Sequence, residues 1–388
     1  MTVLDLRGHF SRFVAADPER IHFAAHSHHY WPDATFAAQA RAWEDAARLA
    51  DEKWEPVFAE LIPAVQTGIA RVLDLPDATT LAVAPNTHDF LRRLLSALPA
   101  GRPGRILTTD GEFHSLTRQL ARLEEDGLVA VERVPAEPAA GFPERFAAAA
   151  RRGGHDLVYV SQVFFNSGAP CGSLAELVGA VRDPETLVAI DGYHGFMAVP
   201  TRLSEVAGRI FYLAGGYKYA MAGEGACFMH CPPGYAPRPR DTGWFAAFGA
   251  LSARQAGVLY GTDGSRFLGA TFDPSGLYRQ RAVFDWMERV GLTVPAIHDH
   301  VLALQRIFLD RVEAGAIPGL REARLVTPAE DPGRGHFLTF ETPRAEALHR
   351  ELLARRVVTD VRGARIRFGF GCYHGPADIV CAVARLAG

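Results

Sequence analysis

The stretch that organises the chain is Phe211-Tyr-Leu-Ala-Gly-Gly-Tyr-Lys-Tyr-Ala-Met-Ala-Gly-Glu-Gly-Ala-Cys-Phe-Met-His230. Its pattern predicts a buried strand, a glycine-rich turn that carries Lys218, and a second short apolar strand. Lysine is rare in this chain, because only Lys53 and Lys218 among the 41 basic residues are lysines. A desolvated lysine, unlike an arginine, can lose its proton and attack a carbonyl. We therefore interpret Lys218 as a Schiff-base lysine; the alternative is an ordinary lysine in a loop.

The composition is that of an ordinary globular protein. With 388 residues, of which 48% are hydrophobic and 22% charged, the chain is long enough for one large domain and a smaller one. A formal net charge of −3 gives no reason to expect a nucleic acid or a membrane as partner. The five cysteines lack the spacing of a zinc site or a disulfide framework. We find no targeting pattern and no apolar segment long enough to cross a bilayer, so we expect a cytoplasmic protein.

Apolar runs alternate with amphipathic segments along most of the chain. After a helical segment from Asp33 to about Leu73, strands are expected at 80–84, 105–110, 128–134, 155–161, 186–191, 209–214 and 225–230. This alternation indicates an α/β fold with a mostly parallel sheet covered by helices. Ligands of such sheets bind beyond the carboxyl ends of the strands.

Two groups of residues at strand ends point to a cofactor. Asn86, Thr87 and His88 stand at a helix N-terminus, which is a ready site for a phosphate or, more simply, a helix cap. Asp191 ends an apolar strand, and its spacing from Lys218 is that of one strand-crossover-strand unit, so the two can face one crevice. A pyridoxal phosphate enzyme needs such a lysine, an acid for the pyridine nitrogen and a phosphate cradle. Taken singly, Asp191 could instead be a helix cap.

The segments Asp191-Gly-Tyr-His194 and Tyr217-Lys-Tyr219 together resemble the class V aminotransferase group of fold-type I pyridoxal phosphate enzymes, and within it kynureninase-like proteins most. The resemblance runs from about residue 20 to the C-terminus. It implies a large, mostly parallel seven-stranded sheet domain and a smaller α/β C-terminal domain. Residues 1–49 would form an arm and helix packing with the small domain, residues 50–270 the large cofactor-binding domain, and residues 271–388 the small domain.

The resemblance also implies the site. Lys218 would be the catalytic residue that holds pyridoxal 5′-phosphate. The cofactor-binding residues would be Asn86, Thr87, Phe113, Asp191, His194, Tyr217, Trp244 and Thr271. Arg367 would bind the substrate α-carboxylate, for which a guanidinium is suited, with Ser27 and His28 also on the substrate side. Arg367 could instead be part of a solvated stripe. Thr271 would reach the neighbouring subunit's site in a homodimer with shared active sites, and no metal is expected.

The sequence departs from the family pattern where the substrate is expected to bind. His26-Ser-His-His29 replaces Asn-Ser-Leu-Gly, Gly369-Phe-Gly-Cys372 replaces a proline-rich stretch, and Phe164 stands where many relatives have an asparagine near the cofactor hydroxyl. We expect these positions to line the substrate side, where the histidines could supply a general base. Aromatic residues that suggest a pocket for a bulky side chain, or are simply core, are Tyr30, Trp31, Trp244 and Phe245.

The resemblance implies an enzyme that acts on a small amino-acid substrate through an external aldimine and a quinonoid. The reaction would be hydrolytic Cβ–Cγ cleavage, as in kynureninase, or transamination. One alternative is β-elimination by a C–S lyase, and another is a non-catalytic binding module on the same fold. Desulfuration by a cysteine nucleophile is disfavoured, because no cysteine lies between Cys231 and Cys372.

A metal hydrolase is the hypothesis from a different chemical class. It would use the histidines at positions 26, 28, 29, 298 and 300. No carboxylate or cysteine stands at a helical spacing from the first three of them, which argues against a zinc site. The sequence leaves open which amino acid is the substrate and which step follows removal of its α-proton.

Overall fold

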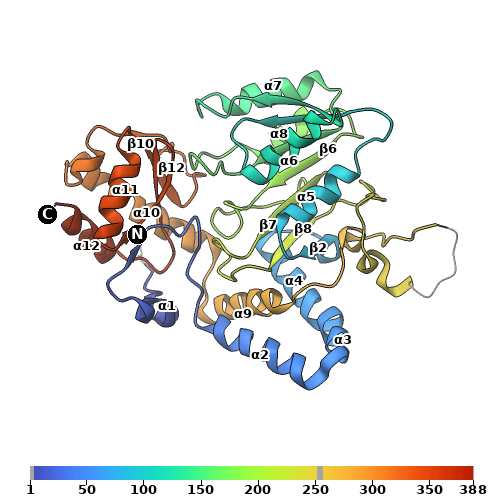
Figure 1. Cartoon of the computed structure of the whole chain (residues 1–388), viewed down its shortest axis with the longest axis horizontal. Helices are drawn as coiled ribbons and strands as arrows, with labels where there is room; N and C mark the ends of the chain where they lie inside the picture. The colour runs from blue at the N-terminus through green and yellow to red at the C-terminus, as the bar shows by residue number, and fades with distance from the viewer. Residues whose placement is uncertain (1–3, 251–256, 388) are drawn as a thin grey trace.

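The computed structural model describes residues 4–250 and 257–387 (Figure 1). A seven-stranded sheet forms its centre. The strands are β2 (Leu81–Ala84), β3 (Gly104–Thr109), β4 (Val129–Val134), β5 (Leu157–Ser161), β6 (Leu187–Asp191), β7 (Ile210–Gly215) and β8 (Cys227–His230), in the order β2-β8-β7-β6-β5-β3-β4. β8 runs antiparallel to β2 and β7, and all other neighbours are parallel. The predicted mostly parallel seven-stranded sheet is thus confirmed.

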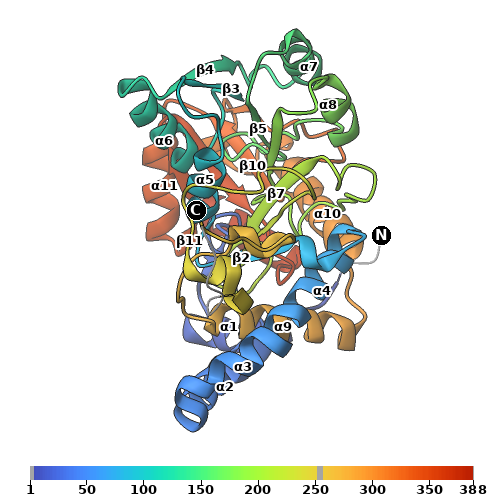
Figure 2. The same cartoon turned by 90° about the vertical axis from the view of Figure 1, so that its right-hand side faces the viewer.

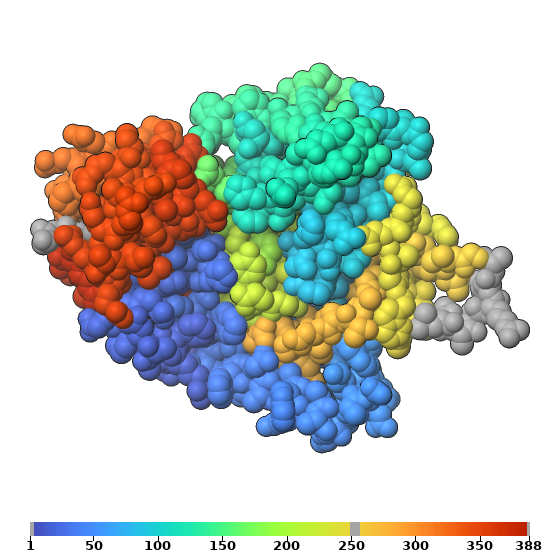
Figure 3. Space-filling model, viewed as in Figure 1, coloured from blue at the N-terminus to red at the C-terminus, as the bar shows by residue number. Residues whose placement is uncertain are grey.

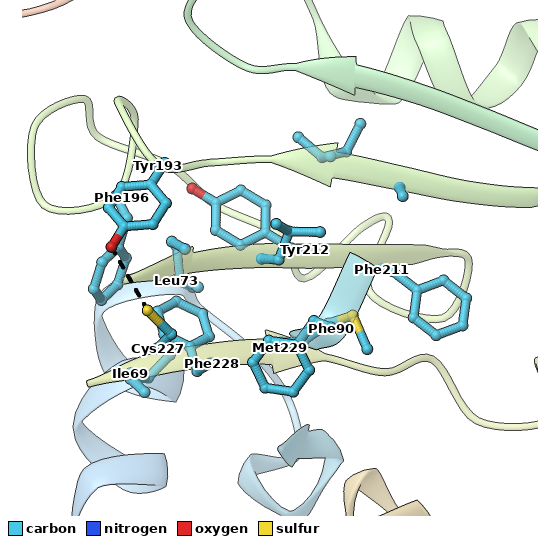
Figure 4. Packing of buried hydrophobic residues seen from close by; sticks show 14 of the residues in the cluster. Ile69, Leu73, Phe90, Tyr193, Phe196, Phe211, Tyr212, Cys227, Phe228 and Met229 are labelled. Carbon is cyan, nitrogen blue, oxygen red and sulfur yellow. Dashed lines mark hydrogen bonds between the residues drawn. The ribbon is translucent and has the colours of Figure 1, made fainter. Parts of the chain in front are cut away.

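Helices cover the sheet and connect its strands. They include α5 (Thr87–Ser96), α6 (His114–Glu125), α7 (Phe142–Arg152) and α8 (Leu174–Ala180), seen with the sheet in Figure 2. The central strands are buried on both faces, which explains why their sequences are continuous apolar runs without alternation. In Figure 4, Ile69 and Leu73 lie beside the buried side chains of β7 and β8, including Phe228.

A long helical run leads into the sheet. It contains α2 (Ala34–Leu49), α3 (Trp54–Pro56) and α4 (Ile62–Leu73), and both α2 and α4 contact α9 (Ser275–Val290). Contrary to the sequence expectation, one window of residues 34–73 is long and apolar enough to cross a membrane by length and composition alone. In the structure 44% of that window is buried inside the fold.

The C-terminal part has its own sheet and its own core. The sheet order is β12 (Asp360–Arg362), β13 (Arg365–Gly369), β10 (Phe337–Glu341), β9 (Arg324–Leu325), all antiparallel. It is accompanied by α10 (Val294–Glu313), α11 (Ala345–Ala354) and α12 (Pro376–Ala387). Phe23 of the N-terminal arm packs in the core of this part, together with Phe308 and Phe368.

The N-terminal arm lies against the C-terminal part, as the blue and red segments of Figure 1 show. Its strand β1 (Ile21–His22) pairs in parallel with β11 (Val357–Val358), while α1 (Ser11–Ala16) precedes it. This pairing carries the residues after β1 towards the end of the large sheet. The predicted domain boundaries remain a prediction; α9, which follows residue 270, packs in the core of the large sheet.

Candidate active site

Lys218 lies in a tight turn directly after β7. The N–H of Ala222 donates to the carbonyl of Gly216 at 2.8 Å, and the N–H of Met221 donates to the carbonyl of Lys218 at 3.0 Å. Met221 and Gly223 both have positive φ, of 59° and 69°. Only a glycine fits at position 223, because a Cβ there would lie 2.3 Å from the Trp31 ring.

A cavity of about 300 Å³ lies at the carboxyl ends of β5, β6 and β7. The predicted site residues that line it are Asn86, Thr87, Phe113, Asp191, His194, Tyr217 and Lys218. They come from four separate segments of the chain, so the fold brings together most of what the sequence proposed. In Figure 3 lime-green chain, the colour of the β7–β8 region, shows at the surface between the blue arm, the red C-terminal part and the cyan α5.

The Lys218 amine is buried among aromatic rings. Its Nζ lies 2.8 Å from Nε2 of His194 and 4.8 Å from the centre of the Tyr193 ring, with Phe113 at 5.5 Å. Burial lowers the pKa of Lys218 from 10.5 to about 7, although the negative charge of Asp191 opposes this. Lys218 can therefore be a neutral amine, and so a nucleophile or base, near neutral pH.

Asp191 is the half-buried carboxylate at the end of β6. It accepts a hydrogen bond from the backbone N–H of Tyr193 at 2.9 Å and another from the hydroxyl of Tyr159 at 3.1 Å. Burial raises the pKa of Asp191, whereas the two donors and the charge of Lys218 lower it. A cation placed in the cavity would stabilise the ionised form.

Helix α5 directs its N-terminus at the same cavity. Asn86 caps the helix, since its Oδ1 accepts a hydrogen bond from the N–H of Asp89 at 3.0 Å. The helix-cap interpretation is therefore right, and it is compatible with anion binding, because the first N–H groups of a helix lack intrahelical partners. Thr87 and His88 at this helix end also line the cavity.

Sequence reasoning missed a buried carboxyl group behind the cavity. Glu112 accepts hydrogen bonds from the Thr109 hydroxyl at 2.7 Å, and from the Ser161 hydroxyl at 2.6 Å and N–H at 3.2 Å. Burial raises the pKa of Glu112 to about 7, partly offset by these donors. Ser161 itself lines the cavity. The only signal in the sequence was a glutamate next to Phe113.

Arg367 lies outside the cavity and is buried. Its Nη1 donates to the carbonyl of Phe165, and its Nη2 forms an ion pair with Asp360. The alternative of a solvated stripe is thus wrong for Arg367, which is 3% exposed. Phe165 lines the cavity and contacts the Phe113 ring edge to face, and its ring centre lies 5.9 Å from the Arg367 guanidinium carbon, so Phe165 adjoins both the cavity and Arg367.

The substrate-side expectations are partly corrected. Phe164 does not line the cavity; it packs against Phe142 in the core, and Phe165 takes the place beside the site. Trp31 packs on Gly223, and Tyr30 stacks on Tyr373 at 4.4 Å. The aromatic residues at the cavity are instead Phe113, Tyr159, Phe165, Tyr193 and Tyr217.

Trp244 and Thr271 do not reach the cavity of this chain. Trp244 is 45% exposed and packs on Phe245 at 4.3 Å, and Thr271 is exposed. Their assignment as cofactor-binding residues therefore stays a prediction, because a contribution to a neighbouring subunit's site needs a second copy of the chain.

Ser27 and His28 line a second cavity, of about 480 Å³, together with Asp360 and Arg362. The exposed His28 ring stacks on Tyr217 at 5.1 Å, so this cavity adjoins the first. The histidines proposed for a metal hydrolase do not converge. Within residues 4–250 and 257–387 no group of three potential metal ligands is assembled.

Comparisons with known proteins agree with this fold. Residues 297–386 match the family model of the kynureninase C-terminal domain. A kynureninase from Pseudomonas fluorescens is 30% identical over 182 residues, which span 46% of this chain and 42% of that protein. The matched part is thus less than half the length of this curated relative. The resemblance to kynureninase-like proteins is confirmed by these two findings.

Solved structures extend the likeness to the whole chain. A cystine C–S lyase, C-DES, in complex with cysteine persulfide has a TM-score of 0.77 at 17% identity, covering 95% of this chain and 97% of that one. A cysteine desulfurase from Thermococcus onnurineus NA1 has a TM-score of 0.78 at 15% identity, covering 100% and 98%. A C-DES variant with glycine covalently linked to its PLP cofactor has a TM-score of 0.78 at 17% identity, covering 98% of each chain. The chain has the fold of these proteins.

Proposed function

We propose that this protein is an enzyme that binds pyridoxal 5′-phosphate and acts on a small amino acid. The observation that carries the proposal is the position of Lys218 and Asp191 in one cavity, which the N-terminus of α5 also enters. Matches to a kynureninase and to a lyase with a PLP cofactor support it.

The residues at the cavity fit this cofactor. A buried amine with a pKa of about 7 suits the aldehyde, and the ionised Asp191 suits a protonated pyridine nitrogen. The unpaired N–H groups of α5 suit the phosphate. Phe113 offers an aromatic face, and Nδ1 of His194 has no hydrogen-bond partner among the described residues. These residues would hold the group.

When bound, the cofactor supplies an electron sink for negative charge on the substrate α-carbon. Lys218 would take the α-proton at Nζ, because a pKa of about 7 leaves much of its amine neutral near pH 7. The hydrogen bonds from Tyr159 and the Tyr193 N–H favour the ionised form of Asp191, against the burial that raises its pKa. Arg367, which lies beside Phe165 outside the cavity, would bind the substrate carboxylate, and Phe165 would keep water from the part of the cavity that it lines.

The reaction that we propose first is hydrolytic Cβ–Cγ cleavage of a kynurenine-like amino acid, or transamination, supported by the kynureninase matches. A second candidate is β-elimination of a sulfur-containing amino acid, which is supported by the fold likeness to a C–S lyase. A cysteine nucleophile is not part of either proposal. Cys372 is buried against the Met221 sulfur at 3.7 Å, and burial raises its thiol pKa to about 12.

We also propose a homodimer that acts in the cytoplasm. Partly exposed aromatic side chains, Trp244 and Phe248, form an apolar surface beside Phe58 that a second copy could cover. None of the five cysteines, all in the described part of the chain, forms a disulfide, which fits a reducing compartment.

The test is the visible absorption spectrum of the purified protein with and without added pyridoxal phosphate, followed by product analysis. We expect a yellow protein whose colour is lost in Lys218→Ala and kept in the control Lys53→Ala. Alanine from L-kynurenine would indicate hydrolysis, a 2-oxo acid that retains the substrate side chain would indicate transamination, and pyruvate with ammonia from L-cystine would indicate β-elimination. A protein that stays colourless after reconstitution would favour a binding module without catalysis.

A further inference from the structure

His26 is a buried imidazole without hydrogen bonds. It is 1% exposed, and its ring stacks on Phe337 of β10 at 4.9 Å. Neither ring nitrogen has a hydrogen-bond partner within the described chain. Nε2 lies 3.6 Å from Oδ2 of Asp360, a distance too long for a hydrogen bond. Leaving both nitrogens of a buried imidazole without hydrogen bonds costs free energy. We therefore expect another group to form a hydrogen bond with His26 in some state of the protein.

The Asp360 oxygen that faces His26 is the one bound by Arg367. Oδ2 of Asp360 accepts from Nη2 of Arg367 and is also the atom nearest Nε2 of His26. Nη1 of Arg367 is held by the Phe165 carbonyl, whereas Nε of Arg367 has no partner among the described residues. Nε and Nη2 form one edge of the guanidinium, and a carboxylate binds such an edge bidentately. A carboxylate that takes this edge must displace Asp360.

We infer that His26 and Asp360 form a proton-accepting pair that becomes active when a substrate carboxylate displaces Asp360 from Arg367. Nε2 of His26 accepts the proton that the substrate ammonium group must lose, so one N–H bond of the ammonium breaks and one forms at Nε2. The displaced Asp360 carboxylate accepts a hydrogen bond from this new Nε2–H. The amino acid is left with a neutral, nucleophilic amine, the imidazolium is neutralised by Asp360, and no other bond changes. This inference rests on the proposed function, because it needs an amino acid at Arg367.

The charges around His26 support a rise in its proton affinity when a substrate carboxylate binds. The pKa of His26 is lowered to about 4, chiefly by burial and also by the charges of Arg367 and Lys218, while Asp360 opposes this. A substrate carboxylate would neutralise Arg367 and release Asp360, so both changes raise the proton affinity of His26. The charged or titratable groups that face His26 are Asp360 of β12, Arg367 of β13, His22 of β1, and Lys218 and His194 at the cavity. Burial lowers the pKa of His22 and of His194, so neither competes for the proton.

The test is a histidine NMR titration of the cofactor-loaded protein with propionate as the probe. Propionate has the carboxylate but no amine, so any proton gained comes from the buffer. The His26 signal is assigned with His26→Asn, and the Nε signal of Arg367 reports occupancy. We expect propionate to raise the pKa of His26 by about one unit or more, a tenfold gain in proton affinity. In Asp360→Asn this rise should vanish.

His29 is the internal control. It is equally buried, but its Nδ1 bonds the Tyr30 carbonyl at 2.6 Å, so propionate should leave its titration unchanged. If propionate moves the Arg367 signal and His26 titrates as before, this inference falls and the proposed function stands. If neither propionate nor L-alanine moves the Arg367 signal, the carboxylate site falls, and both proposals fall with it. If Asp360→Asn does not fold, the titrations of His26 and His29 in the wild-type protein, with and without propionate, still test the inference.

Discussion

Nζ of Lys218 lies 2.8 Å from Nε2 of His194, and both side chains are buried. A neutral imidazole that accepts at Nε2 carries its hydrogen on Nδ1, which has no partner within residues 4–250 and 257–387. Burial lowers the pKa of both groups, so the pair can hold a proton only weakly. This arrangement makes Lys218 a free amine under conditions in which an exposed lysine is almost fully protonated.

The first prediction is that Lys218 reacts with aldehydes at a pH at which Lys53 does not. In cofactor-free protein, the rate of adduct formation at Lys218 should rise with a midpoint at about pH 7. The measurement is borohydride trapping followed by peptide mass spectrometry, with Lys53 as the internal standard.

In His194→Phe the midpoint should move down, because the variant loses the acceptor that stabilises the Lys218 ammonium group. Equal midpoints for the two lysines would show that Lys218 is solvated in solution, and would remove the basis for its role as a base.

The second prediction concerns Glu112 and the pH dependence of stability. The folded-state pKa is raised from 4.5 to about 7, so between these values the folded protein binds more protons than the unfolded chain. The free energy of unfolding must therefore fall as pH rises through this window, by about 3 kcal/mol from this group alone. In Glu112→Gln the amide keeps the shape without the charge, so most of this fall should disappear.

Urea unfolding at several pH values measures the effect, with the exposed Glu55→Gln as the matched control. Glu112→Gln should be more stable than the wild type at pH 8 and about as stable as the wild type at pH 4. A parallel pH profile in wild type and Glu112→Gln would mean that the pKa of Glu112 is the same in the folded protein as in the unfolded chain.

The cavity and the sheet were predictable because local pattern determines them. Apolar runs marked the central strands, and the parallel arrangement placed Asp191 and Lys218 at one edge. Phe164 was placed wrongly because it lies beyond the end of β5, where the chain turns and no strand alternation determines which side chain faces the cavity; Phe165 faces it instead. Glu112 was missed because its burial depends on donors from two strands that only the folded chain brings together.

The position of His26 depends on pairing between segments far apart in the sequence. The arm reaches the site through the pairing of β1 with β11, and through the bridge between Ala24 and Gly369. No local pattern encodes that register. The sequence could therefore name three candidate histidines, but it could not separate the buried His26 from the exposed His28.

A third prediction is that only one cysteine of the native protein reacts readily with iodoacetamide. Cys381 is exposed, whereas burial raises the thiol pKa of Cys171, Cys227, Cys231 and Cys372 to about 11 or 12. The thiolate is the reactive form, so mass spectrometry should find a single adduct, on Cys381. Cys372→Ala should retain catalysis. Loss of about a hundredfold or more in this variant would restore cysteine-dependent desulfuration as a candidate.

The last prediction tests the turn that holds Lys218. In Gly223→Ala a methyl group would lie 2.3 Å from the Trp31 ring, at a backbone φ of 69° that alanine rarely adopts. We expect a loss of about 2 to 4 kcal/mol in the free energy of unfolding, measured with urea. Gly208→Ala is the matched control, because its Cβ would meet no atom within 4 Å, and it should change stability by less than about 0.5 kcal/mol.

A double variant separates the two causes of that loss. Trp31→Ala opens the space above Gly223, so the steric part of the cost should be absent when Gly223→Ala is added to it, whereas the backbone part should remain. The second step should then cost about 1 kcal/mol, the usual penalty for a non-glycine residue at positive φ. An unchanged cost in the Trp31→Ala background would show that backbone strain alone, and not contact with the arm, demands glycine beside Lys218.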